Sequence, residues 1–373
     1  MAGTTVAREV DPRRALALRL TRSGLSARVA DPVEAARRPL QDLSADAALL
    51  ALGARVEDLD RDGFDARLDD GRLACAHVVR GAIHVVDPEA EGRFGRALLA
   101  RDDDELAAQL GRAALGQLAE AGIPASEALA EVAAAIVDAL AGDAALDRTA
   151  LHAALRERVR EALLPWCRGC ESRHVAPMVW RWGTVVAGAR LDARRRYRRP
   201  AAPADPPPAI EAARAFLRWY GPTTRPAMAE WLGVVPAHGR RLWEALGDEL
   251  VAVRVDGRTA HLLADDLDAL DDVAPPEGVR LLPPGDPALQ KPARELLVPD
   301  AAVRKRLFRP VASPGAVLRD GRIVGLWRTR VAGRRLRIEV EPVDRRCTAR
   351  AVGEEAERIA RLRGRELGEL AVG

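Results

Sequence analysis

Apolar and polar positions follow their clearest pattern between residues 210 and 263. Ile210–Tyr220 carries apolar residues at helical spacing, and Gly221-Pro222 ends that segment. Thr223 or Thr224 then offers a hydroxyl that caps a short second helix. Gly233 ends this helix, and Pro236 suits the first turn of a third. The pattern therefore predicts three consecutive helices with a tight turn between the last two.

Two alternating runs follow the third helix, Val251–Val255 and Arg258–Leu263, with Asp256-Gly257 between them. A two-residue Asp-Gly loop between such runs is the strongest short signal for a β-hairpin. Three helices and a hairpin predict a winged helix, whose second and third helices form a helix-turn-helix. Winged helices bind either DNA or proteins, and the pattern leaves both open. For DNA, Arg240 and Arg241 on the third helix are the candidate contacts.

The N-terminal part repeats this order of helices followed by strands. Helices are expected over residues 13–28, 33–38 and 47–56, with Ser44 as the N-cap of the third. Residues 78–86 are apolar and β-branched, and Arg80-Gly81 interrupts them, which predicts a strand, a turn and a second strand. We therefore expect a first winged helix here.

The rest of the chain adds helices and then strands. Residues 88–165 are rich in Ala and Leu and predict helices, and a Pro-rich linker follows the basic run at 194–199. Beyond residue 279 an Asp320-Gly321 turn predicts strands, with a terminal helix over Glu354–Leu370. The expected fold class is α+β, tandem winged-helix domains with a small C-terminal antiparallel β-barrel. The expected domains are a first winged helix (1–90), a helical or second winged-helix region with a basic tail (91–200), a winged helix (201–278), and the barrel with its helix (279–373).

Composition indicates a globular protein of two or three domains, since 48% of the 373 residues are hydrophobic. The sequence contains no run of 18 apolar residues, so it predicts no membrane span. The charged N-terminus and the four cysteines are typical of a cytoplasmic protein. The net charge of +3 is unevenly spread. It is +4 over residues 1–40, −12 over 41–150, +8 over 151–200, −5 over 201–280 and +8 over 281–373.

Nearly all of the basic charge is arginine, whose planar guanidinium suits phosphate, although an Ala- and Arg-rich composition explains the same counts.

Gln41 and Asp42 lie just before a predicted helix start, where free backbone amides hold polar groups. They therefore either cap that helix or take part in catalysis. Arg80 and His84 are four residues apart, which on a strand puts both on one face. They either hold a phosphate or form a surface pair.

Cys167 and Cys170, with His174, have the residue types of a metal site. Zinc needs a fourth ligand and usually a second closely spaced pair, and neither lies nearby. We therefore expect no metal and no other cofactor. The same segment is basic, and Arg173 and His174 are candidate DNA contacts.

Several pieces spread along the chain resemble the AlkZ/YcaQ-like family of winged-helix DNA-binding proteins, which includes DNA glycosylases. They are LQDxxxxAALLALGARV, VVRGAIHVVDPE, CRGCESRHV, YGPTTRPAMAEWLG, LLPPGDPALQ, RELLVPD and PGAVLRDGRIVGLWR. The resemblance implies tandem winged helices and a β-barrel around a DNA channel. It also implies hydrolysis of the N-glycosidic bond of bulky alkylated or crosslinked purines in double-stranded DNA.

The family's catalytic motif, Gln-x-Gln or Gln-x-Asp, falls on Gln41-Asp42-Leu43. The first position matches, and the second is a leucine, which cannot activate water. We expect any catalysis to use Gln41 to orient water and Asp42 as base or electrostatic stabiliser. Arg80 and His84 match the family's Arg-x-x-x-His element.

The expected function is that of a DNA-binding protein resembling these glycosylases. The alternative is a catalytically inactive DNA-binding, regulatory or ligand-sequestering protein. A regulator usually binds as a dimer. No dimerising coiled coil is visible in this sequence, so a monomer is expected.

Overall fold

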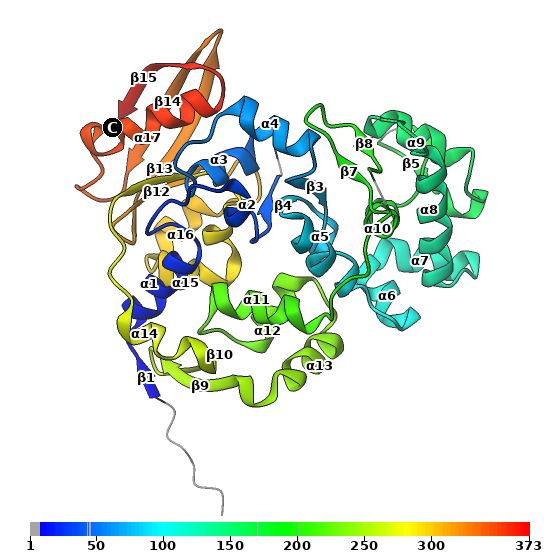
Figure 1. Cartoon of the computed structure of the whole chain (residues 1–373), viewed down its shortest axis with the longest axis horizontal. Helices are drawn as coiled ribbons and strands as arrows, with labels where there is room; N and C mark the ends of the chain where they lie inside the picture. Colours follow the sequence, from blue (N-terminus) through cyan, green and yellow to red (C-terminus); the bar gives the residue numbers. More distant parts are fainter. Residues whose placement is uncertain (1–7, 43, 45, 170, 201) are drawn as a thin grey trace, which may run out of the picture. The chain divides into compact units, whose positions relative to one another are not determined.

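The computed structural model describes residues 8–42, 44, 46–169, 171–200 and 202–373 (Figure 1). The chain divides into two compact units. The first consists of the chain up to Phe64, Ala213–Met228 and Trp243–Gly373, and the second of Asp65–Ala212 and Ala229–Leu242. Both units contain helices and strands, which confirms the predicted α+β class. No helix in the described ranges is long and apolar enough to cross a membrane.

The first unit begins with short elements whose starts the sequence dictates. Asp11 and Asp31 each precede a proline, and their carboxylates accept hydrogen bonds from Arg13 N at 2.8 Å and Val33 N at 2.9 Å. Each Asp-Pro pair therefore starts a helix. The elements are β1 (Arg8–Val10), α1 (Pro12–Arg22), α2 (Pro32–Ala35), β2 (Leu40–Gln41), α3 (Ala47–Gly53) and α4 (Arg61–Asp69), the last of which leads into the second unit.

The segment with the clearest pattern forms the predicted elements. They are α11 (Ile210–Tyr220), α12 (Arg225–Leu232), α13 (Pro236–Leu246), β9 (Leu250–Val255) and β10 (Arg258–Leu263). Asp256 and Gly257 both have positive φ, at 51° and 72°, as the predicted hairpin turn requires. Strand β1 pairs with β9 in parallel, so the hairpin becomes a three-stranded sheet in the order β1-β9-β10.

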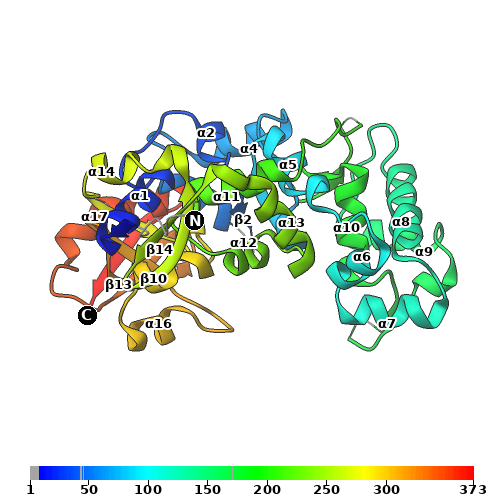
Figure 2. The ribbon, with the colours of Figure 1, turned by 90° about the horizontal axis from the view of Figure 1, so that it is seen from below.

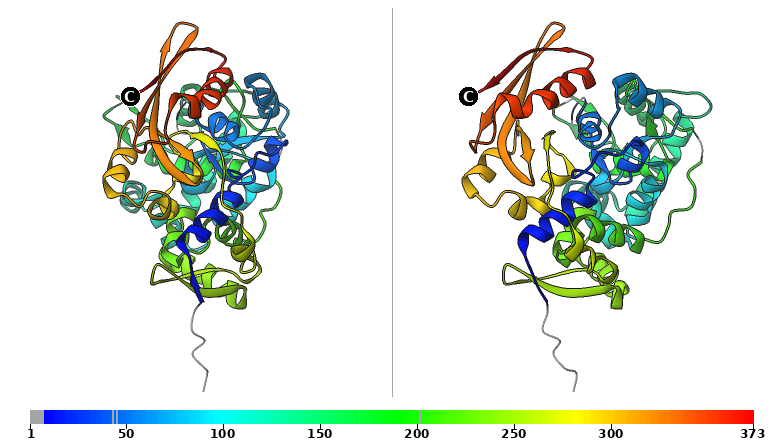
Figure 3. Two further views of the ribbon diagram at one scale, coloured as in Figure 1. Left: turned by 90° about the vertical axis from the view of Figure 1, so that its left-hand side faces the viewer. Right: turned by 60° about the vertical axis from the view of Figure 1, so that its left-hand side comes forward.

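The C-terminal part of the first unit is a five-stranded sheet backed by a helix (Figure 3). The sheet order is β11-β12-β13-β14-β15, with β11 and β15 at its two edges, so the expected closed barrel is wrong. The elements of this part are α14 (Ala269–Asp272), β11 (Val279–Leu282), α15 (Arg294–Leu297), α16 (Ala301–Leu307), β12 (Gly315–Arg319), β13 (Arg322–Ala332), β14 (Arg335–Pro342), α17 (Ala349–Leu362) and β15 (Glu366–Val372).

The predicted terminal helix, Glu354–Leu370, is confirmed only over its first part, because α17 ends at Leu362. Gly364 takes a positive φ of 62°, which ends the helix, and Glu366–Val372 then pairs in parallel with β14. An unpaired strand edge needs backbone partners, and the last residues supply them. The sheet is therefore mixed and not antiparallel.

The second unit combines a small sheet (Figure 1) with a group of packed helices (Figure 2). Its strands run in the order β4-β3-β7-β8. Helices α8 and α10 pack closely because Gly183 has no side chain, and a Cβ there would lie 2.7 Å from Cγ1 of Val132. The elements are β3 (Ala74–His77), β4 (Ile83–Val86), α5 (Pro88–Phe94), α6 (Asp103–Leu110), α7 (Arg112–Ala121), α8 (Ala125–Ala139), α9 (Arg148–Arg156), β5 (Trp166–Cys167), β6 (Ser172–Arg173), α10 (Pro177–Ala187), β7 (Arg190–Leu191) and β8 (Tyr197–Arg198).

A buried ion pair joins distant segments of the first unit. The Arg55 guanidinium binds both carboxylate oxygens of Asp286, each at 2.8 Å, and the two side chains are 2% and 0% exposed. Arg55 also donates to the carbonyls of Ser23 at 2.8 Å and Ala51 at 2.7 Å. Asp286 in turn accepts from the Ala288 amide at 2.9 Å. These bonds tie the end of α3 to the segments after α1 and β11.

Replacing Gly183 by alanine is expected to destabilise the protein by about 1–3 kcal/mol, because the new methyl group overlaps Val132 in a packed interface. Gly116, on α7, is the control, since it is exposed and a Cβ there meets nothing within 4 Å. Gly116→Ala should stabilise by about 0.5–1 kcal/mol through helix propensity. Urea unfolding measures both variants. Equal effects of the two substitutions would contradict the close packing of α8 and α10.

Replacing Arg55 by methionine is expected to lower the free energy of unfolding by about 3–5 kcal/mol, because the Asp286 carboxylate then stays buried without its partner. The Arg346–Asp344 pair, with side chains 35% and 36% exposed, provides the control, and Arg346→Met should change stability far less. Chemical denaturation compares the two variants. An equal loss of unfolding free energy in both variants would show that burial does not make the Arg55 pair more important for stability than the Arg346 pair.

Candidate catalytic loop and DNA contacts

The candidate catalytic residues lie immediately before α3 in the first unit. Gln41 ends the short strand β2 and is half-buried, and Leu40 beside it is fully buried. The Asp42 carboxylate accepts a hydrogen bond from the Ala48 amide at 3.2 Å, in the first turn of α3. A negative group is favoured at this end of a helix. Asp42 therefore has a capping role, whatever further role it has, while Leu43 lies outside the described residues.

The start of α3 corrects the expected N-cap. Asp46, and not Ser44, holds the N-cap position, with a left-handed φ of 72° and no capping bond from its own side chain. Its carboxylate instead pairs with Arg61 and, at 3.1 Å, with Nε of Arg363. Arg363 also donates to the Thr329 hydroxyl at 2.9 Å. Two guanidinium groups therefore hold the Asp46 carboxylate at the start of α3.

The far end of α3 is held against α17. A Cβ on Gly53 would lie 2.2 Å from Cδ1 of Leu362, so a larger residue here would force the Leu362 side chain to shift. Arg358 donates to the Gly53 carbonyl at 2.9 Å, which provides a cation at the helix C-terminus. Every residue of α3 is buried. The helix that carries the candidate loop is therefore fixed at both of its ends.

Arg80 and His84 do not share a strand face as expected. Arg80 lies in a 3-10 turn at Val79–Gly81, between β3 and β4, with a left-handed φ of 58°. His84 lies on β4. Arg80 donates to the Trp231 carbonyl at the end of α12, so its guanidinium supports a helix C-terminus. The Arg80-Gly81 interruption that the sequence showed is this turn.

His84 is an uncharged, buried group. It is 1% exposed, and burial, with a smaller contribution from the Arg80 charge, lowers its pKa to about 3. Nδ1 lies 2.9 Å from the Ala82 carbonyl, which is an acceptor only. The neutral ring therefore carries its proton on Nδ1 and a lone pair on Nε2. His84 offers a hydrogen-bond acceptor and no positive charge for a phosphate.

Arg173 and His174 lie at the β5–β6 hairpin. Arg173 is exposed and donates to the Leu164 carbonyl at 3.1 Å. Nδ1 of His174 lies 3.0 Å from the Val175 carbonyl. Cys167 is half-buried on β5, and Cys170 lies outside the described residues. In the described ranges no group of three or more His, Cys, Asp or Glu side chains is placed to hold a metal.

Arg240 and Arg241 are adjacent on α13 but have different surroundings. Arg241 forms a bidentate pair with Glu105 of α6, at 2.7 and 2.6 Å. Arg240 is exposed, and no described residue forms an ion pair or hydrogen bond with its guanidinium. The identical side chains thus differ in what they offer to a phosphate. A phosphate that binds Arg241 must displace the Glu105 carboxylate, whereas a phosphate that binds Arg240 displaces no described residue.

The eight candidate residues divide between the two units. Gln41 and Asp42 belong to the first, and all six DNA-contact candidates belong to the second. Sequence reasoning missed Asp46 and its partners Arg61 and Arg363. Asp46 and Arg363 are 317 positions apart, and no local pattern connects them.

Comparison with known proteins identifies the family. The model of the family "DNA glycosylase AlkZ-like" matches residues 23–362. An interstrand DNA cross-link repair glycosylase of Streptomyces sahachiroi is 26% identical over 330 residues, which cover 82% of this chain and 83% of that protein. The structure of the Streptomyces sahachiroi DNA glycosylase AlkZ superposes with a TM-score of 0.77 at 23% identity, covering 98% of this chain and all of the other. The protein therefore belongs to the AlkZ-like DNA glycosylase family.

Proposed function

We propose that this protein is a monofunctional DNA glycosylase that hydrolyses the N-glycosidic bond of bulky alkylated or crosslinked purines in double-stranded DNA. The observation that carries the proposal is the Gln41–Asp42 loop, held at the start of a buried helix in a chain of this family. The relative from Streptomyces sahachiroi is named for interstrand cross-link repair, which supports a bulky lesion as the substrate. We infer that the protein acts as a monomer.

In this proposal Gln41 orients the attacking water and Asp42 supplies negative charge. The transition state of glycosidic hydrolysis resembles an oxocarbenium ion, which a nearby carboxylate stabilises. Asp42 stands one position before the family's second polar residue. Its bond to the Ala48 amide fixes the direction of the carboxylate, and Arg363 holds Asp46 at the start of the same helix. A fixed carboxylate is what electrostatic stabilisation requires.

We propose that the helices and hairpins act as winged helices that bind the DNA backbone. The α11–α12–α13 order followed by the β9–β10 hairpin supports this for residues 201–278. The first of the tandem units would occupy residues 1–90 and a helical or second winged-helix region residues 91–200, with 279–373 as the C-terminal sheet domain. Phosphate contacts would come from Arg173, Arg240 and Arg241, which are exposed. Arg80 and His174 would support the surface from half-buried positions, and His84 from a buried one.

A second candidate function is a DNA-binding protein without excision activity. Leu43, at the family's second polar position, favours it, because a leucine side chain has no group that positions water. This protein would bind the same DNA and release no base. The two candidates therefore differ in product formation and not in affinity.

Incubation with duplex DNA that carries a bulky N7-alkylguanine or an interstrand crosslink is expected to yield abasic sites, scored by strand cleavage in alkali. Gln41→Ala and Asp42→Asn should each lower the single-turnover rate by about 100-fold or more, the scale of a general acid–base contribution. Asparagine is used because its amide oxygen retains the bond to Ala48. Ser44→Ala, an exposed change in the same loop, is the control and should leave the rate unchanged.

Circular dichroism and DNA affinity separate the outcomes of this experiment. A folded wild-type protein that binds the lesion duplex and forms no abasic site at high concentration would exclude the glycosylase and leave the inactive binder. Equal rates for wild type, Gln41→Ala and Asp42→Asn would place the catalytic groups elsewhere in the chain.

Arg240→Gln is expected to weaken DNA binding and to reduce the slope of log affinity against log salt by about 0.9, the value for one lost phosphate contact. Glu105→Gln should have the opposite effect, because it removes the carboxylate that occupies Arg241. Both effects should be alike for different duplex sequences, since phosphate contacts carry no sequence information. Fluorescence anisotropy across a salt series measures them. An Arg240→Gln protein with wild-type affinity at every salt concentration would remove α13 from the interface.

A further inference from the structure

Two side chains of the first unit hold the Arg363 guanidinium in a fixed direction. Arg363 is the C-cap residue of α17. Its Nε donates to the Asp46 carboxylate at 3.1 Å, and its Nη1 donates to the Thr329 hydroxyl of β13 at 2.9 Å. A free arginine side chain samples many rotamers, and two such bonds leave it few. The fold therefore sets the direction of the remaining nitrogen, Nη2.

Nη2 of Arg363 is open to a ligand. No described residue accepts a hydrogen bond from it. Nη2 does not belong to the described donors that are both enclosed and without a partner, and 20% of the side chain is exposed. An acceptor from outside the protein can therefore reach this nitrogen.

This open donor lies at the start of the helix that holds the candidate catalytic loop. Asp46, the partner of Arg363, occupies the N-cap position of α3, and Asp42 accepts from the Ala48 amide in the first turn of that helix. Asp46 has a left-handed φ of 72°, which non-glycine residues rarely adopt. Its ion pair with Arg363 stabilises this conformation, so Asp46 and the guanidinium form one fixed arrangement.

The charges at this end of α3 indicate which ligand the donor fits. In the proposed reaction a sugar with a phosphate on each side reaches the loop, and the Asp42 and Asp46 carboxylates repel those phosphates. A cation beside the carboxylates offsets this repulsion. A guanidinium donates well to phosphate oxygens, and one that is already fixed loses little freedom on binding. A fixed arginine such as Arg363 therefore suits this position better than an unpartnered one such as Arg240.

We propose that Arg363 binds a phosphodiester group of the substrate strand next to the lesion and so positions the reacting sugar at the Gln41–Asp42 loop. Asp46 and Thr329 act as positioning residues, because they direct the guanidinium. This inference rests on the proposed function and adds a substrate contact in the first unit, whereas the DNA-contact candidates from the sequence all lie in the second.

Single neutral methylphosphonates in an otherwise charged duplex test this contact. The duplex carries one tetrahydrofuran site, a stable analogue of the abasic product, so that binding is measured without excision. Fluorescence anisotropy gives the affinity with one methylphosphonate at each phosphate near that site in turn. For the wild-type protein, one position beside the site should lower the affinity by about 10- to 100-fold, the scale of one hydrogen bond between charged groups.

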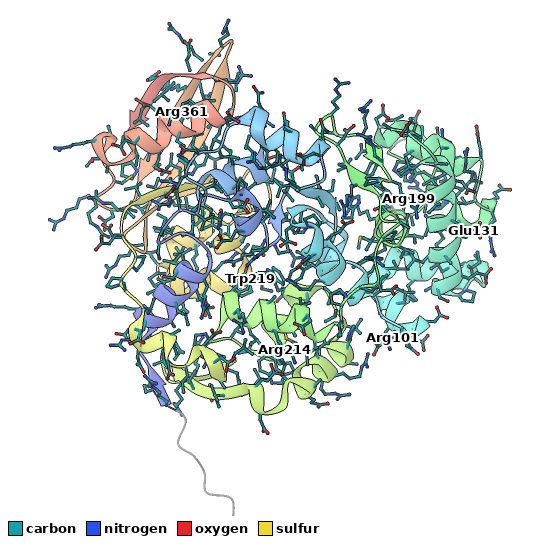
Figure 4. All side chains as sticks on the ribbon, in the orientation of Figure 1. Arg101, Glu131, Arg199, Arg214, Trp219 and Arg361 are labelled. Atoms are coloured by element: carbon teal, nitrogen blue, oxygen red, sulfur yellow. The ribbon has the colours of Figure 1, made fainter. Side chains whose placement is uncertain are left out.

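Arg363→Met should abolish this loss at that one position, because the phosphate there no longer has its partner. Arg361→Met is the matched control. Arg361 is exposed on α17, pairs with Glu357 at 3.8 Å and is labelled in Figure 4, and its variant should retain the wild-type loss. Thr329→Val keeps the charge and removes the hydroxyl that directs it, so the loss should become smaller. Circular dichroism establishes that each variant is folded, and Thr329→Val decides the question should Arg363→Met fail to fold.

A purely structural role of Arg363 predicts a different result. Without its bonds to Asp46 and Thr329, the protein would then bind every duplex more weakly by the same factor, and the loss caused by the methylphosphonate would persist. That result in a folded Arg363→Met protein would overturn the inference, as would a wild-type protein that shows no loss at any position beside the site.

Failure of the proposed function gives separate signs. A wild-type protein that does not bind the duplex would overturn both the proposed function and this inference. A wild-type protein that shows the position-specific loss, yet forms no abasic site on alkylated DNA, would overturn the glycosylase activity and support the phosphate contact.

Discussion

The buried Arg55–Asp286 pair is the constraint on which the first unit depends. A guanidinium with almost no contact with water is stable only where its donors all find acceptors, and here these come from Ser23, Ala51 and Asp286. The segments that provide them are far apart in sequence. The cost of separating the charges therefore makes the packing of α1, α3 and the segment after β11 a single cooperative event.

This constraint reaches the candidate catalytic loop through α3. Arg55 binds the Ala51 carbonyl and Arg358 the Gly53 carbonyl, so the end of the helix cannot shift. At its start, the Asp42 carboxylate accepts from the Ala48 amide, and Arg363 holds the Asp46 carboxylate. Catalytic side chains act only when their supporting residues hold them within a fraction of an ångström. The buried Arg55–Asp286 pair therefore also supports, through α3, the positions of Gln41 and Asp42 that the proposed chemistry requires.

The sequence predicted the elements that local chemistry determines. Ile210–Tyr220 is a helix because its apolar face and its Gly-Pro end lie within the segment, and Asp256-Gly257 turns because both residues tolerate positive φ. Predictions failed where the structure of a segment depends on a partner that is distant in the sequence. Residues 366–372 have helix-forming glutamates and leucines, yet the open edge of β14 draws them into the sheet. The ion pair of Asp46 likewise depends on Arg363, which lies 317 positions away, so no local pattern predicts it.

Arginine content alone is a poor guide to the DNA surface of this chain. Many of the 58 basic side chains already have partners within the protein, as in the Arg214–Glu249 pair at 2.7 Å or the bond from Arg199 to the Ala187 carbonyl (both arginines are labelled in Figure 4). Only an arginine without such a partner adds a full counterion-releasing contact when it meets a phosphate. Arg240 and Arg241 carry the same signal in the sequence, and Glu105 makes them different. In the proposed DNA interface, the positions of the acidic residues would therefore decide which guanidinium groups contribute to affinity.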